Sequence, residues 1–244
     1  MENIYESTRT LGEYLLFHYG SPKEQFPWTD GPLDALGFPR RTVEELFDPT
    51  QKIKKALDLG CAVGRSSFVL ADIADSVIGI DYSQSFIDTA MSLLECGELV
   101  YEYHEEADRW KKGYVKIDSK PKNLNFELGD ACCLREDLGS FDLVHAANLL
   151  CRLPNPQAFL DRLNELVAPG GQLLLTTPFT WLEDFTPKEN WLSGQDCSSA
   201  LKEILSCSFQ LELEMNMPFL IREHKRKFQY TVALGMRWRK KEKT

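Results

Sequence analysis

The sequence predicts an α/β fold built around a mostly parallel sheet, and three observations support this prediction. Short apolar runs alternate with amphipathic stretches through the middle of the chain, which is typical of parallel strands joined by right-handed helical crossovers. A turn with two glycines follows the first apolar run, and acidic residues end the next ones. The last third changes to two long strand-like runs, which indicate an antiparallel pair at one edge of the sheet.

Seven runs rich in aliphatic and aromatic residues predict the strands of one seven-stranded sheet. In chain order these runs are residues 54–60, 76–81, 124–130, 141–148, 172–178, 209–215 and 227–238. Five amphipathic stretches predict helices, which the alternation with strands places on both faces of the sheet. These stretches are residues 4–20, 64–74, 83–97, 155–167 and 198–207.

Four segments interrupt this rhythm. Residues 21–41 are rich in Pro and Gly and are expected to be irregular. A short helix is predicted over 42–48, where Thr42 and Glu45 have the spacing of a capping box. Residues 98–123 fit no clean element and are interpreted as an insertion with a charged helix near its centre. Residues 216–226 are interpreted as the connection between the last two strands.

Length and composition predict one soluble domain over residues 1–244, with 43% hydrophobic and 27% charged residues. No apolar run approaches the ~20 residues that cross a bilayer, and the N-terminus lacks a signal-peptide pattern, so we expect a cytoplasmic protein without membrane contact. The seven cysteines form no CxxC pair and are expected to be reduced. No His and Cys spacing predicts a metal site.

The charge is unevenly distributed along the chain. Residues 221–244 carry nine Lys or Arg against two Glu, whereas the whole chain has a net charge of −9. A basic end raises nucleic acid as a partner. However, apolar residues alternate with a period of two from Phe228 to Trp238, which predicts a half-buried strand. We therefore expect no nucleic-acid partner.

The first glycine turn predicts a nucleotide-type cofactor at the carboxyl ends of the strands. Gly60 and Gly64 permit a tight turn and a close helix start, with Ala62 midway between them. Asp58 before the turn would repel a pyrophosphate but attract the ammonium of a methionine moiety, which favours S-adenosylmethionine over a dinucleotide. Asp81 ends the second strand and fits the two ribose hydroxyls. Asp130 ends the third strand and fits the adenine amino group.

These features resemble the class I S-adenosylmethionine-dependent methyltransferases, which have a Rossmann-like fold. Asp58, Gly60 and Gly64 match the first motif of that family, and residues 166–178 look like its turn before the fifth strand. The resemblance implies S-adenosyl-L-methionine as cofactor and S-adenosyl-L-homocysteine as product. The cofactor-binding residues that it implies are Tyr14, Asp58, Gly60, Cys61, Ala62, Gly64, Asp81, Tyr82, Asp130, Ala131 and Asn148.

Several longer stretches resemble a narrower family, the methyltransferase of ovothiol biosynthesis, which includes the C-terminal domain of 5-histidylcysteine sulfoxide synthase. These stretches are "YESTRTLGEYLLFHYG", "ANLLCRLPNPQAFLDRL", "TTPFTWLEDFTPKENWLSG" and "MPFLIREHKRKFQ". The resemblance implies transfer of the methyl group to the ring nitrogen of 5-thiohistidine that lies nearest the side chain, giving ovothiol A. It also implies the sulfoxide synthase as the supplier of substrate.

An amino-acid substrate calls for a cation to bind its carboxylate and for an acid to bind its ammonium. Residues 1–50 are expected to form a helical lid, with Tyr14, His18 and Tyr19 on the side that closes over the cofactor. Residues 179–197 are unusually aromatic and are expected to form a substrate loop. The catalytic candidates are Asn148, His145 and His224. The substrate-binding candidates are Tyr19, Arg152, Phe179, Trp181, Lys188, Glu189 and Arg222, with Arg222 and His224 expected in the turn of the last hairpin.

Other readings stay open at this point. His145 also fits a hydrogen-bonded core histidine, and Arg152 also fits an ion pair with Asp161 or Glu165. The substrate could be another small imidazole or thiol metabolite. An RNA-modifying enzyme loses support because Asn148 is not followed by the Pro-Pro-aromatic run of many base-amine methyltransferases. A cofactor-binding protein without catalysis is disfavoured by the intact carboxylates.

Overall fold

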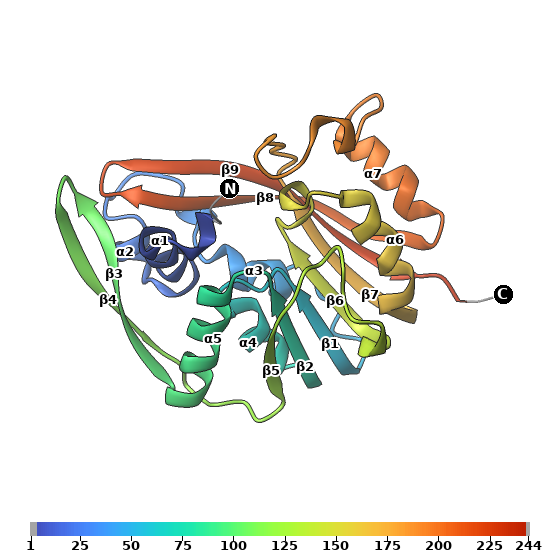
Figure 1. Cartoon of the computed structure of the whole chain (residues 1–244), viewed down its shortest axis with the longest axis horizontal. Helices are drawn as coiled ribbons and strands as arrows, with labels where there is room; N and C mark the ends of the chain where they lie inside the picture. The colour runs from blue at the N-terminus through green and yellow to red at the C-terminus, as the bar shows by residue number, and fades with distance from the viewer. Residues whose placement is uncertain (1–3, 243–244) are drawn as a thin grey trace.

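The computed structural model describes residues 4–242, and a seven-stranded sheet forms its centre (Figure 1). The strand order is β5-β2-β1-β6-β7-β9-β8. These strands are β1 (Ile53–Leu59), β2 (Ala74–Asp81), β5 (Leu124–Leu128), β6 (Phe141–Ala147), β7 (Val167–Thr177), β8 (Phe209–His224) and β9 (Lys227–Lys240). Strand β9 runs antiparallel to both β7 and β8, and the strands from β5 to β7 pair in parallel. The predicted mostly parallel sheet with an antiparallel pair at its edge is confirmed.

Helices cover both faces of this sheet, and alternate strand residues supply two hydrophobic cores. Leu143 and Leu174 belong to one core, whereas Val144 and Leu173 belong to the other, as the period of two in a strand requires. The helices are α1 (Thr8–Tyr19), α2 (Pro22–Gln25), α3 (Phe38–Glu44), α4 (Arg65–Ala71), α5 (Gln84–Cys96), α6 (Pro156–Leu166) and α7 (Cys197–Ser206). Helices α1, α3, α4 and α5 pack on the first core, and α6 and α7 on the second.

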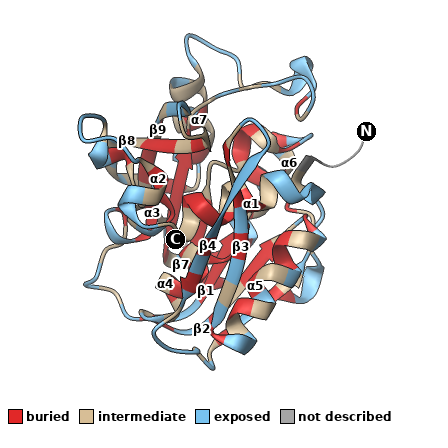
Figure 2. Ribbon diagram, turned by 90° about the vertical axis from the view of Figure 1, so that its left-hand side faces the viewer, coloured by how far each residue is buried: buried red, intermediate tan, exposed pale blue. Residues whose placement is uncertain are grey.

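The insertion is a β-hairpin, so the charged helix predicted within residues 98–123 is wrong. Strand β3 (Glu98–Glu106) pairs antiparallel with β4 (Arg109–Lys116) as a separate two-stranded sheet. Tyr101, Tyr103 and Val115 are buried, while their charged neighbours Glu102 and Lys116 are exposed. That alternation has the period of a strand. Figure 2 looks onto this hairpin, whose exposed residues lie in front of the buried strands of the central sheet.

The hairpin lies against the N-terminal helix. Gly12 of α1 approaches β3 so closely that an added Cβ would lie 2.1 Å from the backbone oxygen of Glu102. Only a glycine permits this approach. The helix is therefore wedged between the inserted hairpin on one side and the rest of the molecule on the other.

Two further local expectations are wrong. Strand β8 continues to His224, so Arg222 lies within the strand and the turn between β8 and β9 is shorter than expected. Helix α3 begins at Phe38 and ends at Glu44, so Thr42 is inside the helix and does not cap it. The Thr42 hydroxyl instead donates to the carbonyl of Pro39 at 3.0 Å.

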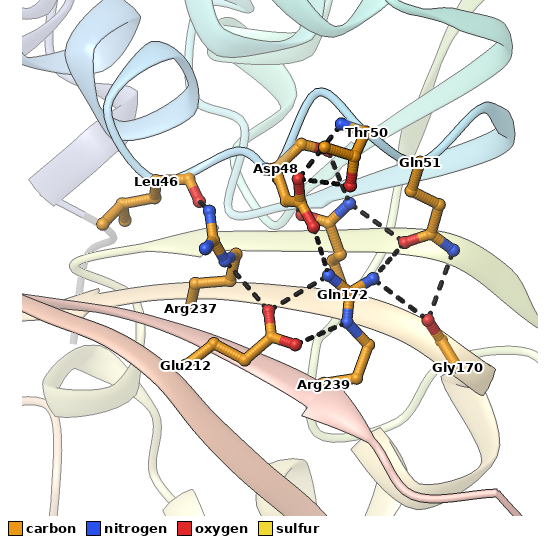
Figure 3. A network of polar contacts seen from close by, with 9 residues as sticks. All are labelled: Leu46, Asp48, Thr50, Gln51, Gly170, Gln172, Glu212, Arg237 and Arg239. Atoms are coloured by element: carbon orange, nitrogen blue, oxygen red, sulfur yellow. Dashed lines mark hydrogen bonds and ion pairs between the residues drawn. The ribbon is translucent and has the colours of Figure 1, made fainter.

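The arginines of the basic C-terminal strand are paired with acidic residues. Arg237 and Arg239 both bind Glu212, and Arg239 also binds Asp48 at 2.7 Å (Figure 3). Gln172 of β7 completes this network through the backbone of Asp48. These contacts fix the segment before β1 against the sheet. Within residues 4–242, no helix is both long enough and apolar enough to cross a membrane.

Candidate cofactor and substrate cavity

A cavity of about 450 Å³ opens at the carboxyl ends of β1, β2 and β6. One part, which we call the strand-end half, is lined by residues of the loops that follow the strands. These residues are Gly60, Cys61, Ala62, Asp81, Tyr82, Asp130, Ala131 and Asn148. The other part, the lid half, is lined by residues of the N-terminal segment, α1, α3, the short helical turn Leu150–Arg152 after β6, the loop after β7 and the hairpin β8–β9. These residues are Tyr5, Tyr14, Phe17, His18, Phe38, Arg152, Asp184, Phe185, Phe219, Gln229 and Thr231.

The glycine turn gives the strand-end half its shape. Gly60 and Gly64 have left-handed backbones, with φ of 70° and 87°. A Cβ at Gly64 would also lie 2.6 Å from the ring of Phe126, so α4 starts directly against the sheet. Ala62 has a φ of 47°, which is left-handed too and is strained for any residue with a side chain. The departure from glycine at this position has therefore not changed the course of the loop.

Asp81 is the best-defined polar group of this half. Its Oδ2 accepts from the Ala62 amide at 2.8 Å, and its Oδ1 accepts from the Ser83 amide at 2.9 Å. Burial raises the pKa of the Asp81 carboxyl to about 6, against the lowering effect of these amides. Two oriented carboxylate oxygens at the end of β2 suit the pair of hydroxyls on a ribose.

Asp58 does not line the cavity, because His145 covers it. His145 Nδ1 donates to Asp58 Oδ1 at 2.7 Å, and Ser67 Oγ donates to Asp58 Oδ2 at 2.6 Å. The second ring nitrogen of His145 lies 3.0 Å from the Thr42 hydroxyl. The expected direct contact between Asp58 and an ammonium is therefore not available in this arrangement. His145 does line the cavity, and both of its nitrogens lie within hydrogen-bond distance of protein groups.

Asn148 stands where β6 ends, with a left-handed φ of 54°. Its side-chain oxygen accepts from the Thr176 hydroxyl at 3.0 Å, and its backbone amide bonds Thr176 as well. This clamp directs the side-chain NH₂ group away from Thr176. Asn148 therefore offers the cavity a hydrogen-bond donor and not a base.

The lid half is walled by aromatic rings that come from segments far apart in the sequence. Tyr5 lies between Tyr14 of α1, at 5.9 Å between ring centroids, and Phe185 of the loop after β7, at 6.0 Å. Burial raises the pKa of Tyr14 well above its ordinary value, so its hydroxyl stays protonated. Glu6 accepts from the first amides of α5, which fixes the N-terminal segment across the cavity.

Arg152 is the cation of the lid half. Its guanidinium donates to the carbonyl of Thr180 at 2.7 Å and lies 5.0 Å from the ring of Phe185. No carboxylate pairs with it among residues 4–242, and neither expected partner does so. Asp161 accepts from Gln157, and Glu165 pairs with Arg162. Asp184 also lines the cavity, so one cation and one carboxylate of the lid half face the same space.

Several predicted substrate residues lie outside the cavity. Trp181 stacks on Trp191 at 6.4 Å, with Lys188 over the outer face of Trp191, and Glu189 is exposed beside them. Tyr19 donates to the backbone of Val63 at 2.8 Å. Phe179 packs on the second hydrophobic core, and His224 lies at the end of β8, beside His104 of the inserted hairpin.

Arg222 is buried away from the cavity, which removes the basis for its expected role in binding a substrate carboxylate. Only 4% of the residue is exposed. Its guanidinium forms an ion pair with Glu105 of β3, donates to the backbone of Glu24 at 2.6 Å and lies over Tyr103. Arg222 thus joins the last hairpin to the inserted one.

Sequence reasoning missed several residues that line the lid half. Tyr5 precedes the first helix, Asp184 sits two residues before the buried Thr186, and Gln229 and Thr231 are polar residues on β9. Gln229 and Thr231 alternate with apolar residues, so the period of two placed them on the solvent side, whereas Tyr230 and Val232 are exposed and Gln229 and Thr231 line the cavity. Nothing in the sequence indicated that this strand reaches the cavity.

The comparisons with known proteins agree on the fold. Residues 34–215 match the family described as the methyltransferase domain. The ubiquinone biosynthesis O-methyltransferase of Coxiella burnetii is 30% identical over 128 residues, which are 52% of this chain and 45% of that protein. The chain therefore matches less than half the length of that relative.

Two solved structures cover more of the chain at lower identity. A SAM-dependent methyltransferase from Methanosarcina mazei has a TM-score of 0.56 and 18% identity, covering 79% of this chain and 95% of its own. The N-methyltransferase NodS from Bradyrhizobium japonicum, in complex with S-adenosyl-L-homocysteine, has a TM-score of 0.54 and 16% identity, covering 93% of this chain and 100% of its own. These likenesses establish the Rossmann-like fold predicted from the sequence.

Proposed function

This chain belongs to the methyltransferase domain family and uses S-adenosylmethionine, and we propose that it methylates the imidazole ring of 5-thiohistidine to give ovothiol A. The proposal joins the sequence resemblance to one observation, the guanidinium of Arg152 in the lid half of the cavity, which donates to the carbonyls of Cys151 and Thr180 and has no carboxylate partner among residues 4–242. A buried or half-buried cation without a carboxylate partner is costly unless a ligand supplies the negative charge. The carboxylate of an amino acid would do so.

The rest of the lid half supports a small amphoteric ring compound. Asp184 faces the same space as Arg152 and would take the α-ammonium of the substrate. The aromatic walls would stack on a flat ring, and Tyr5, Tyr14 and Phe185 hold it away from water. Exclusion of water favours an in-line displacement in which a ring nitrogen lone pair meets the methyl group at about 3–3.5 Å.

For this reaction the protein has to position the ring nitrogen against the methyl group, and it does not have to move a proton. In 5-thiohistidine the thiolate balances the positive charge that the ring gains when it takes the methyl group. Asn148 would donate its NH₂ group to a ligand oxygen or sulfur beside the strand-end half. His145 holds its own position through Asp58 and Thr42 and would shape the floor of the cavity.

A mass measurement on the purified protein tests this proposal. With S-adenosylmethionine and 5-thiohistidine, we expect a product heavier by one CH₂ unit, together with S-adenosylhomocysteine. Histidine and a thiol-free imidazole run alongside would show whether the thiol is required. If cofactor binds but 5-thiohistidine gains no mass, the proposal is wrong.

A second candidate is O-methylation of a phenol, because the relative from Coxiella burnetii is a ubiquinone biosynthesis O-methyltransferase and the lid half is aromatic. A phenol carries no carboxylate and would leave Arg152 unpaired. A catechol in the same assay therefore separates the two functions. Turnover of the catechol but not of the amino acid would favour the second.

A further inference from the structure

We propose that the neutral imidazole of His18 accepts a hydrogen bond from the ring N–H of the substrate, and so selects the ring nitrogen that receives the methyl group. This inference rests on the proposed function, because it needs a substrate with two ring nitrogens. It assigns the choice between those nitrogens to one side chain of the lid.

His18 has the position that such a contact requires. It lies in the last turn of α1 and lines the cavity. Its ring stacks on Tyr14, with centroids 5.9 Å apart, and meets Phe17 edge-on at 5.5 Å. Among residues 4–242 the ring has no hydrogen-bond partner; the protein closes off Nδ1, so the nitrogen open to the cavity is Nε2. A ligand in the cavity is therefore the partner within reach of Nε2.

The charge of His18 suits the contact as well. Burial lowers the pKa of His18 to about 3, outweighing the opposite effect of Asp58. The ring therefore stays neutral and keeps one bare nitrogen as an acceptor. A neutral ring also places no positive charge beside the sulfonium of the cofactor. His145, the other histidine that lines the cavity, has both nitrogens engaged with Asp58 and Thr42.

The contact fixes the tautomer of the substrate. The reacting ring, with its thiol ionised, has one N–H and one nitrogen lone pair. When the nitrogen remote from the amino-acid side chain donates its N–H to His18, the lone pair lies on the nearer nitrogen. That lone pair forms the N–C bond while the C–S⁺ bond breaks and leaves its electrons on sulfur. The product ring is an N-methylimidazolium balanced by its thiolate, and its N–H still faces His18.

Two substitutions of His18 test the role. His18→Phe keeps a ring against Tyr14 and Phe17 but removes both nitrogens, and we expect kcat/KM for 5-thiohistidine to fall roughly tenfold, the value of one hydrogen bond. We also expect two N-methyl isomers in place of one. His18→Gln places its amide oxygen near the position of Nε2 and should recover the single isomer. Cofactor affinity, measured by calorimetry, should change little in either variant.

A matched control removes a histidine elsewhere. His104 lies on the inserted hairpin, with its ring centroid 5.3 Å from that of Trp110, and His104→Phe should leave both the rate and the isomer unchanged. The proposal is overturned if His18→Phe makes one isomer at the wild-type rate. The proposal is also overturned if loss of the imidazole in His18→Phe lowers the rate while every variant still makes a single isomer.

A measurement on the wild type covers the case in which His18→Phe does not fold. Adding 5-thiohistidine with S-adenosylhomocysteine should shift the ¹⁵N resonances of the His18 ring, and the absence of a shift would overturn the proposal. If the wild type transfers no methyl group to 5-thiohistidine, the proposed function fails by itself. In that case a His18 shift on adding 4-methylimidazole would still support the acceptor site, and no shift would remove it.

Discussion

The two halves of the cavity differ in how far apart in the sequence their residues lie. The strand-end half comes from short loops after consecutive parallel strands, and Asp81 bonds the Ala62 amide directly. The lid half joins α1, the loop after β7 and the hairpin β8–β9, and Arg222 ties this last hairpin to the inserted hairpin through Glu105. Parallel strands place their carboxyl ends together by topology alone. The lid half needs tertiary contacts to hold it in place.

The largest effect is expected from breaking the brace of the lid half. Arg222→Ala removes the buried partner of Glu105, which keeps the more exposed Lys111 at 2.9 Å, so we expect the free energy of unfolding to fall by about 3 kcal/mol, the low end for a broken buried ion pair. Lys225→Ala is the matched control, since Lys225 reaches the same Glu105 only at 4.0 Å and is more exposed; its loss should cost at most about 1 kcal/mol. Denaturant unfolding measures both. An Arg222→Ala variant of normal stability with a raised KM for the amino acid would return Arg222 to substrate binding.

This brace also explains why the lid was poorly predicted from the sequence. The charged run 105–112 was interpreted as a helix and the polar run around Arg222 as a turn, and these two errors have one cause. Glu105 and Arg222 neutralise each other across two hairpins, so each run can continue as a strand. A sequence shows charged residues in series but not their partners 117 positions away. The aromatic loop 179–197 was expected to contact substrate, and here too the sequence does not show the partners. Trp181 and Trp191 stack on each other.

The strand-end half was predictable because its signals are local. Gly60, Gly64 and Asp81 lie where the motif placed them. The exception is Asp58, which His145 covers from a strand 87 positions further along. The identity of a carboxylate before a glycine turn can be read from the sequence. The sequence does not show whether a neighbouring strand covers that carboxylate.

The next effect tests the strand-end half. Asp81→Ala should weaken binding of S-adenosylmethionine about 100-fold or more, because two hydrogen bonds to a carboxylate are each worth about 1.5–3 kcal/mol. Calorimetry measures the loss. Asp81→Ala also removes the acceptor of the Ala62 and Ser83 amides, so the unfolding midpoint without cofactor is measured alongside to show that the variant is still folded. Unchanged affinity would show that the ribose binds elsewhere.

The raised pKa of Asp81 predicts a pH dependence. In the folded protein the carboxyl titrates near 6, above the value of about 3.9 in an unfolded chain. The folded state thus binds the extra proton between these values, so this group lowers stability as pH rises from about 4 to 6. Ribose hydroxyls favour the ionised carboxylate, so cofactor affinity should weaken as pH falls below 6. Calorimetry across this range in Asp81→Asn should show no such weakening.

Substitution of Arg152 is expected to have a smaller effect than that of Asp81, and to change substrate binding in the lid half only. Arg152→Gln removes the charge but can keep a hydrogen bond to Thr180, and we expect KM for the amino acid to rise about 10- to 100-fold, as for a lost charged hydrogen bond. Cofactor affinity should hold. Arg162→Gln is the control, because Arg162 pairs with Glu165 on the outside of α6. A drop in cofactor affinity with unchanged KM would place Arg152 at the cofactor instead.

The smallest effect concerns Ala62, where the strand-end half carries backbone strain. At a φ of 47°, Ala62→Gly removes the steric penalty of the methyl group but loosens the unfolded chain, and the balance should stabilise the protein by about 0.5–1 kcal/mol. Gly64→Ala is the opposite case, because its new Cβ would meet Phe126 at 2.6 Å, and it should destabilise. Cofactor affinity should survive in Ala62→Gly, since the amide that binds Asp81 is kept. If the cofactor affinity of Ala62→Gly falls while its free energy of unfolding rises, the methyl group of Ala62 itself contacts the cofactor. The strained alanine would then be kept at this position because it contributes to binding.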